Sequence, residues 1–300
     1  MNNAVSTDSP TPVRRRDLHF RTVDGVDLPA TLFVDEDAAP NAPAILLSSA
    51  AAVERRFYRA FAEFLLEQGA GTVLTYDYRG LGPAAGKPGA RQHRMKEWGT
   101  HDFPAALDAL ERETDATEII GIGHSFGGLA IGLSGVSDRF RRYAMVASLN
   151  GYYRRTREPL RVFARMNFAG VPATYLLGRV PASMGLGTAL AGPIFRDWAR
   201  WCRRESFFFD DPAVAESARF ADVRLPLLSI GIADDPWGTP AAVSALLQRF
   251  PNADLTERWL TAPAGQRAIG HSGFFRRNLK SSLWRPVSAF LVAGTVPPEA

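Results

Sequence analysis

The sequence predicts an α/β fold with a doubly wound, mainly parallel sheet of about eight strands. Short apolar runs alternate with segments of helical periodicity over residues 17–150 and 223–293, which is typical of consecutive βαβ units. Because crossovers between parallel strands are right-handed, this alternation favours helices on both faces of the sheet. The alternation stops between residues 151 and 222, so the sheet is predicted to carry one long insertion.

The N-terminal region contains a tail, a hairpin and the first strand-helix unit. Residues 1–16 include two prolines and no apolar segment, so we expect a disordered tail and not a secretory signal. Alternating apolar and polar residues on both sides of Asp24-Gly25 predict two half-exposed strands joined by a tight turn. The apolar run 42–51 predicts a buried parallel strand, and the periodic segment 54–69 predicts a helix that stops at its final glycine.

The rest of the core is expected to continue this alternation to residue 293, with 294–300 as a short tail. Further strands are predicted over 70–80, 117–125, 141–150, the first part of 224–238, and 253–262. Further helices are predicted from about Pro104 to 113, and over 126–137, 240–250 and 274–292.

Residues 151–222 form the insertion and are rich in arginine and aromatic residues. Three segments, 152–170, 194–209 and 212–220, resemble short helices without strands between them. Roughly seventy residues are too many for a structureless loop in a compact domain. We therefore expect a helical cap over the C-terminal edge of the sheet, whose aromatic residues either contact an apolar substrate or pack on the core.

Composition excludes several classes of protein. The chain of 300 residues is 46% hydrophobic and 22% charged, as in ordinary globular domains. Its net charge of +4 comes without a basic stripe or recognition motif, so we expect no nucleic-acid partner. The single cysteine, Cys202, rules out an intrachain disulfide and argues against a cysteine metal site. The sequence has no apolar run long enough to predict a membrane span. The absence of a secretory signal favours a cytoplasmic protein.

A strand-to-helix switch occurs at Ser125, within the sequence Gly123-His124-Ser125-Phe126-Gly127. This G-x-S-x-G spacing is required when a serine sits on a sharp turn, because residues two positions to either side come too close for side chains. The apolar strand before it and the small-residue helix after it supply that context. Ser125 is therefore the candidate nucleophile.

A nucleophilic serine needs a histidine base, and the chain has five histidines. His271 lies just after the last predicted strand and before the last helix, where a base can reach the edge of the sheet. His19, His93, His101 and His124 are expected to be surface or packing residues.

The base in turn needs an orienting acid, expected between Ser125 and His271 in the chain. The strand ending in "IADDPWG" supplies two adjacent candidates. Asp235 comes directly before Pro236 at the start of the loop and is the first choice, whereas Asp234 is the alternative acid. Adjacent side chains point in different directions, so one would orient the histidine and the other would cap the turn.

Two backbone N–H groups are expected to stabilise an oxyanion. One belongs to Phe126, directly after the candidate nucleophile and at the positive end of its helix. The other is expected in the loop after the strand 42–51, at Ala51 or its neighbours Ala50 and Ala52. Backbone donors have no side-chain signature, so the sequence does not choose among these three alanines.

These motifs resemble the α/β-hydrolase superfamily, and in particular its bacterial serine-aminopeptidase-like and esterase-type members. The matching stretches are "DYRGLG", "GHSFGG", "ADDPWGTP" and "IGHSGFF", in the family's order across residues 17–293. The resemblance implies Ser125 as nucleophile, Asp235 as acid and His271 as base. The chain departs from the family in the first loop, which reads "SSAAAVERR" where His-Gly is common. Asp77 and Arg79 are interpreted as structural residues.

A serine, histidine and aspartate of this kind suit acyl transfer through an acyl-enzyme, without cofactor or metal. We expect a carboxylic ester or thioester with a hydrophobic acyl or aromatic group as the small-molecule substrate. A peptidase, an amidase, an acyltransferase and a non-catalytic binding module on the same fold are alternatives.

Overall fold

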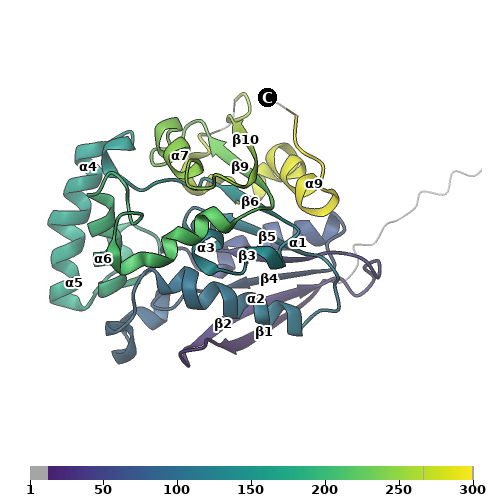
Figure 1. The fold of residues 1–300 in the computed structure, drawn as a ribbon, viewed down its shortest axis with the longest axis horizontal. Helices are drawn as coiled ribbons and strands as arrows, with labels where there is room; N and C mark the ends of the chain where they lie inside the picture. Colours follow the sequence, from purple (N-terminus) through teal and green to yellow (C-terminus); the bar gives the residue numbers. More distant parts are fainter. Residues whose placement is uncertain (1–12, 266, 299–300) are drawn as a thin grey trace, which may run out of the picture.

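The structure is a computed structural model that describes residues 13–265 and 267–298. Its centre is an eight-stranded sheet in the order β1-β2-β4-β3-β5-β6-β9-β10 (Figure 1). The strands are β1 (Arg14–Arg21), β2 (Asp27–Val34), β3 (Ala44–Ser48), β4 (Thr72–Tyr76), β5 (Ile119–His124), β6 (Arg142–Val146), β9 (Pro226–Ile232) and β10 (Asp254–Leu260).

The pairing of these strands confirms the predicted sheet. β1 and β2 form the antiparallel hairpin, and β2 pairs antiparallel with β4. All other neighbouring strands are parallel. β3, β4, β5 and β6 are buried along their full length, which explains why their sequences are continuous apolar runs without alternation.

Helices cover both faces of the sheet and enclose two hydrophobic layers. One layer lies under α1 (Arg59–Glu67) and α9 (Arg285–Ala293), and Phe61 packs edge-on against Trp284 at 5.1 Å between ring centroids. The other layer lies under α2 (Phe103–Arg112), α3 (Phe126–Ser134) and α7 (Pro240–Leu247). Both faces are therefore apolar, as a doubly wound sheet requires.

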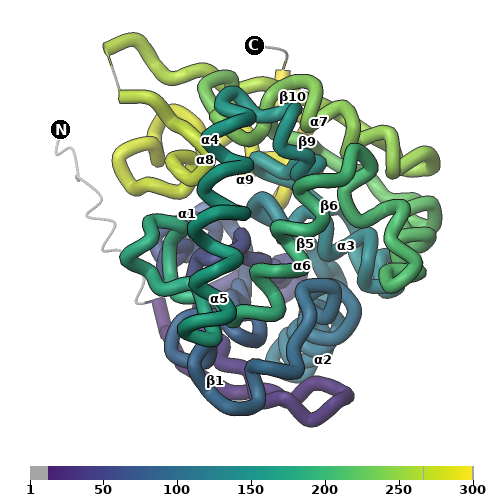
Figure 2. Tube along the Cα trace, turned by 90° about the vertical axis from the view of Figure 1, so that its left-hand side faces the viewer, coloured from purple at the N-terminus to yellow at the C-terminus, as the bar shows by residue number. Residues whose placement is uncertain are grey.

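The insertion between β6 and β9 contains α4 (Pro159–Ala164), α5 (Val171–Leu177) and α6 (Gly192–Cys202). It ends in a 3-10 segment, Pro212–Asp222. The expectation of an insertion without strands is wrong, because β7 (Arg179–Val180) and β8 (Leu190–Ala191) form a short antiparallel ladder. In Figure 2, α4, α5 and α6 lie at the end of the molecule that faces the viewer.

The predicted boundaries differ most from the structure at two places. The tail was expected to reach residue 16, but β1 already begins at Arg14; residues 1–12 lie outside the described range. The α-helix expected over 274–292 begins only at Arg285, because a turn, the 3-10 turn Arg277–Leu279 and the π-helical turn Lys280–Trp284 come before it. After α9, residues 295–298 form neither helix nor strand.

No helix in the described ranges combines the length and the apolar character needed to cross a membrane.

Candidate active site

Ser125 occupies the sharp turn between β5 and α3. Its φ of +51° and ψ of −112° place a non-glycine residue in a rarely populated backbone region. A Cβ on Gly123 would lie 2.2 Å from the carbonyl carbon of Gly127, and a Cβ on Gly127 would lie 2.3 Å from the carbonyl oxygen of Ser48. Both glycines are therefore required by backbone contact, which is the physical origin of the G-x-S-x-G spacing.

The turn brings Ser125 into hydrogen-bond distance of His271. His271 lies on the short helix α8 (Gly270–Gly273), and its Nε2 is 3.0 Å from Ser125 Oγ. Its Nδ1 is 2.7 Å from Oδ2 of Asp235, which follows β9 and is 1% exposed. Three residues far apart in the sequence thus form one hydrogen-bonded chain at the carboxyl ends of β5 and β9.

The environment of Asp235 keeps its carboxylate ionised. Burial by itself would raise the pKa of Asp235, but His271 and the backbone N–H groups of Trp237 and Gly238 outweigh it and hold the pKa below its usual value. The Trp237 N–H donates to Oδ1 at 2.8 Å, so the two carboxylate oxygens have different partners. An ionised acid behind Nδ1 stabilises a positive charge on the imidazole.

Asp234, the alternative acid, has another set of contacts. Its carboxylate accepts hydrogen bonds from the N–H groups of Ile269 at 2.8 Å and Gly270 at 2.7 Å. These donors lie directly before His271. Asp234 therefore holds the backbone that carries the histidine, whereas Asp235 contacts the imidazole itself.

The three alanines after β3 differ in their hydrogen bonding. The Ala50 N–H donates to Tyr58 Oη at 2.9 Å, whereas the Ala51 N–H has no acceptor among the described residues. Ala52 has a φ of +59° and is not on the wall of the cavity that contains Ser125. Ala51 and Phe126 do line that cavity, and Phe126, as the first residue of α3, has no preceding helical carbonyl to bond.

A buried polar chain behind the site was not predicted from the sequence. Tyr58 Oη is 2.8 Å from Nδ1 of His124, and His124 Nε2 is 2.8 Å from the carbonyl oxygen of His271. A carbonyl only accepts, so His124 Nε2 carries the proton and Nδ1 accepts from the Tyr58 hydroxyl. Burial and the neighbouring His271 lower the pKa of His124 to about 3, so it is a neutral packing histidine, as expected.

The cavity above Ser125 has a volume of about 230 Å³ and a mostly apolar wall. Trp198 and Trp237 stack there at 5.9 Å between ring centroids. Side chains come both from the loops at the carboxyl edge of the sheet and from the insertion, which therefore lies over that edge. The lining residues from the insertion are Gly151, Arg165, Gly185, Leu186, Trp198 and Phe207.

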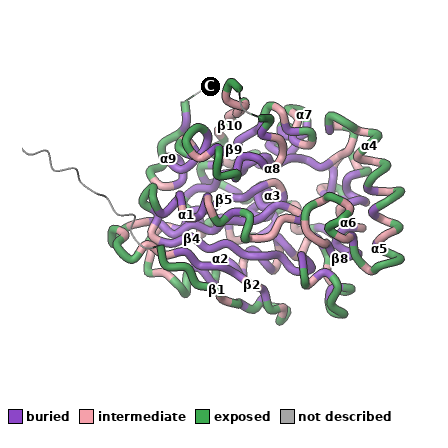
Figure 3. Tube along the Cα trace, turned by 180° about the vertical axis from the view of Figure 1, so that it is seen from behind, coloured by how far each residue is buried: buried purple, intermediate pink, exposed green. Residues whose placement is uncertain are grey.

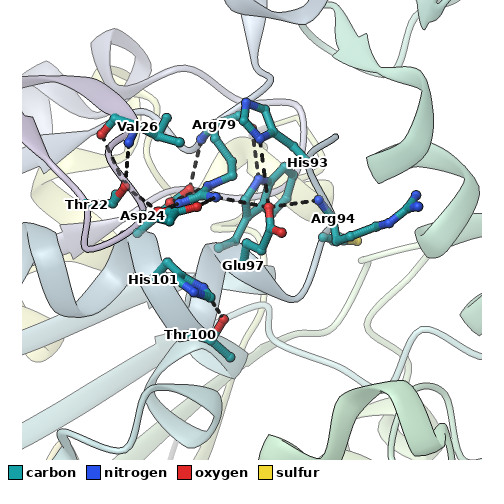
Figure 4. A network of polar contacts seen from close by, with 12 residues as sticks. Thr22, Asp24, Val26, Arg79, His93, Arg94, Glu97, Thr100 and His101 are labelled. Carbon is teal, nitrogen blue, oxygen red and sulfur yellow. Dashed lines mark hydrogen bonds and ion pairs between the residues drawn. The ribbon is translucent and has the colours of Figure 1, made fainter. Parts of the chain in front are cut away.

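Arg79 belongs to a separate network outside this cavity. It is 1% exposed and contacts three carboxylates: Asp24 at 2.6 Å, Glu97 at 3.0 Å and Asp102 at 2.7 Å. Figure 4 shows its guanidinium between Asp24 and Glu97. Burial raises the pKa of Asp102, and the arginine opposes that rise. Arg79 thus ties the loop after β4 to the first hairpin and to the turn before α2, in agreement with the structural interpretation.

The remaining candidates lie away from Ser125. Asp77 forms an ion pair with Arg55, and His19 contacts Asp27 at 2.7 Å on the surface. His93 lies beside Glu97, and His101 contacts the hydroxyl of Thr100 (Figure 4). In the described part of the chain, no three His, Cys, Asp or Glu side chains are grouped to hold a metal ion.

Comparison with known protein families assigns most of the chain to one family. Residues 44–278 match the model of the alpha/beta hydrolase family. The comparison with curated proteins finds no match.

Solved structures with the same fold include several esterases. The Pyrococcus furiosus esterase Pf2001 is similar with a TM-score of 0.59 and 17% identity, over 93% of this chain and 90% of that one. Est1E from Butyrivibrio proteoclasticus with bound ferulic acid is similar with a TM-score of 0.58 and 18% identity, over 91% and 97%. The alpha/beta hydrolase GrgF from Penicillium sp. sh18 is 20% identical, with a TM-score of 0.57 over 93% and 99%. At these identities the likeness shows a shared fold.

Proposed function

Because the chain belongs to the alpha/beta hydrolase family, we propose that it is a serine hydrolase that cleaves a carboxylic ester or thioester. The observation that carries the proposal is the chain of hydrogen bonds from Ser125 Oγ through His271 to Asp235, at 3.0 and 2.7 Å. A nucleophile, a base in contact with it and an ionised acid behind the base are the minimum set for acyl transfer.

The proposed reaction has two halves. Ser125 Oγ attacks the substrate carbonyl while its proton passes to Nε2 of His271, and the negative Asp235 stabilises the resulting imidazolium. The N–H groups of Ala51 and Phe126 stabilise the oxyanion. His271 then returns the proton to the leaving group, which departs as an alcohol or thiol, and water cleaves the acyl-enzyme by the same route.

The substrate is proposed to carry a hydrophobic acyl or aromatic group. The wall of the cavity supports this, since Leu129, Leu149, Phe207 and the stacked Trp198 and Trp237 offer apolar and aromatic surface. The insertion, residues 151–222, acts as the cap in this proposal, because it supplies Trp198 and Phe207. Est1E was solved with the aromatic acid ferulic acid, which is consistent with a site of this kind on the same fold.

Labelling with a fluorophosphonate probe tests the nucleophile. Wild-type protein is expected to be labelled, and Ser125→Ala and His271→Ala to lose the label. Ser272→Ala is the matched control, because Ser272 also lines the cavity but, among the described residues, its hydroxyl forms no hydrogen bond with the imidazole of His271, whose partners are Ser125 and Asp235. Folded wild-type protein that is not labelled, or a label that survives in Ser125→Ala, would contradict the proposal.

A series of substrates then tests which type of bond the protein cleaves. p-Nitrophenyl esters of increasing acyl length, the matching thioesters and aminoacyl amides are compared at equal concentration. Turnover of esters or thioesters, with hydrophobic and aromatic acyl groups preferred, is the expected result. Turnover of amides alone would identify a peptidase or amidase.

A further inference from the structure

One helix of the insertion leaves an apolar face uncovered. α4, the π-helical turn Arg165–Gly170 and α5 follow one another without a break, so residues 159–177 form one helix at the edge of the molecule (Figures 1 and 3). Met166, Gly170 and Thr174 are buried on its inner side. The solvent-facing sides and the last turn of this helix carry large apolar residues; the outer face is defined by Leu160, Phe168, Tyr175, Leu176 and Leu177.

These five side chains are unusual for their exposure. They are 82%, 76%, 73%, 83% and 61% exposed. Among the described residues, Val23 is the only other large apolar residue that is more than half exposed. Single exposed apolar residues need no explanation, but five on one helix indicate an interaction surface.

The charge around the outer face is strongly positive. From residue 153 to the end of α6 at residue 202, the sequence has eight arginines against two acids, Glu158 and Asp197. The rest of the chain has 27 basic and 29 acidic residues, so the excess positive charge lies in this segment. Arg161, Arg165 and Arg179 are exposed on or directly after the helix. Its one exposed acid, Glu158, is paired with Arg161 at 2.9 Å.

The combination of exposed apolar residues and positive charge argues against a second copy of the chain as the occupant of the outer face. A symmetric dimer through the outer face would place the same arginine-rich segment on both sides of the interface. Like charges brought together in this way oppose association. The occupant must therefore offer apolar surface and negative charge together.

We propose that the outer face docks on an anionic lipid surface. Apolar side chains on one side of a helix enter the boundary between head groups and acyl chains, while arginines beside them bind lipid phosphates. The long arginine side chains lie flat along the apolar surface and keep their charge in the head-group layer. Because Arg165 also lines the cavity over Ser125, docking brings that cavity close to the lipid.

Vesicle flotation tests the proposal. Full-length protein is mixed with vesicles of phosphatidylcholine alone or of phosphatidylcholine with phosphatidylglycerol. Binding is expected to the anionic vesicles and to weaken as salt is added. Phe168→Glu and Leu176→Glu are each expected to weaken binding by about tenfold or more, since each removes an apolar group that enters the lipid and adds repulsion from the anionic head groups.

The matched control is Val23→Glu, which makes the same kind of change at an 89% exposed site in the first hairpin. It is expected to bind as wild type does, and thermal unfolding of all variants checks that they fold. Three results would overturn the proposal. They are no flotation of wild-type protein, a loss of binding in Val23→Glu equal to that in the outer-face variants, or equal binding to neutral and anionic vesicles. A light-scattering mass of a dimer that Leu176→Glu dissociates, without vesicle binding, would identify a second copy instead.

Discussion

Asn substitutions at the two adjacent aspartates, Asp234→Asn and Asp235→Asn, are predicted to have different effects. In the protein, Asp235 Oδ1 accepts from the Trp237 N–H and Oδ2 faces Nδ1 of His271. An asparagine at position 235 keeps its carbonyl on the Trp237 N–H and turns its NH₂ group toward the imidazole. Nδ1 must then accept, the proton moves to Nε2, and Nε2 no longer accepts the proton of Ser125.

The expected cost at position 235 is about 10³- to 10⁴-fold in kcat, with little change in stability. Asp234→Asn instead offers one neutral carbonyl oxygen to the two backbone N–H groups of Ile269 and Gly270, so one of them faces an NH₂ donor and loses its acceptor. Asp234 is only partly buried, so the expected loss is about 1–2 kcal/mol in the free energy of unfolding, with less than a tenfold change in kcat.

The assay combines hydrolysis of a p-nitrophenyl ester, which gives kcat and KM, with urea unfolding of the same preparations. Each variant thus supplies the control for the other. Equal losses of kcat in the two variants would refute the assignment of separate roles. So would an Asp235→Asn protein that keeps more than a tenth of wild-type turnover.

Three further predictions concern the surroundings of the site. Gly238→Ala places a Cβ 2.6 Å from Oδ2 of Asp235, so kcat is expected to fall about tenfold or more in a folded protein; unchanged kcat would contradict this contact. The pKa of His124 is lowered to about 3, against an ordinary 6.5, so the unfolded state binds more protons between these values. The free energy of unfolding should therefore fall as pH is lowered from about 6.5 to about 3, and His124→Gln should flatten that dependence in urea titrations. Arg79→Met leaves its carboxylates without their cation and should cost about 3–5 kcal/mol of stability, whereas a change below 1 kcal/mol would refute the structural role.

Most of the sheet could be predicted because buried parallel strands have a distinctive sequence. The runs at 42–51 and 117–125 contain the fully buried β3 and β5, and apolar runs this short favour a strand over a helix. The ladder of β7 and β8 could not be predicted, since two-residue strands leave no periodicity. Likewise, nothing in the segment 274–292 signals the π-helical turn that interrupts it.

The candidate site could be predicted where chain order and local turns determine it. The strand-to-helix switch identifies Ser125, and the position after the last strand identifies His271. The choice between Asp234 and Asp235 depends on how the turn after β9 rotates the two side chains, which the adjacent sequence positions do not reveal. The contact between Tyr58 and His124 joins residues 66 positions apart and follows only from the packing of α1 against the sheet.

The contact between Tyr58 and His124 also helps to explain how the loop after β3, which has no glycine, supports the Ala51 N–H as the proposed oxyanion donor. Ala52 itself adopts the positive φ of +59° that a glycine would otherwise provide, and its carbonyl accepts from the Thr188 N–H at 2.8 Å. Ala50 is held by Tyr58, and Tyr58 is held by His124, which also binds the carbonyl of His271. Ala51 lies between two anchored neighbours, so its N–H has little freedom to turn away from the cavity. A single buried chain thus fixes both the loop of the proposed donor and the backbone of the proposed base, and the alanines replace glycine at the cost of one strained φ.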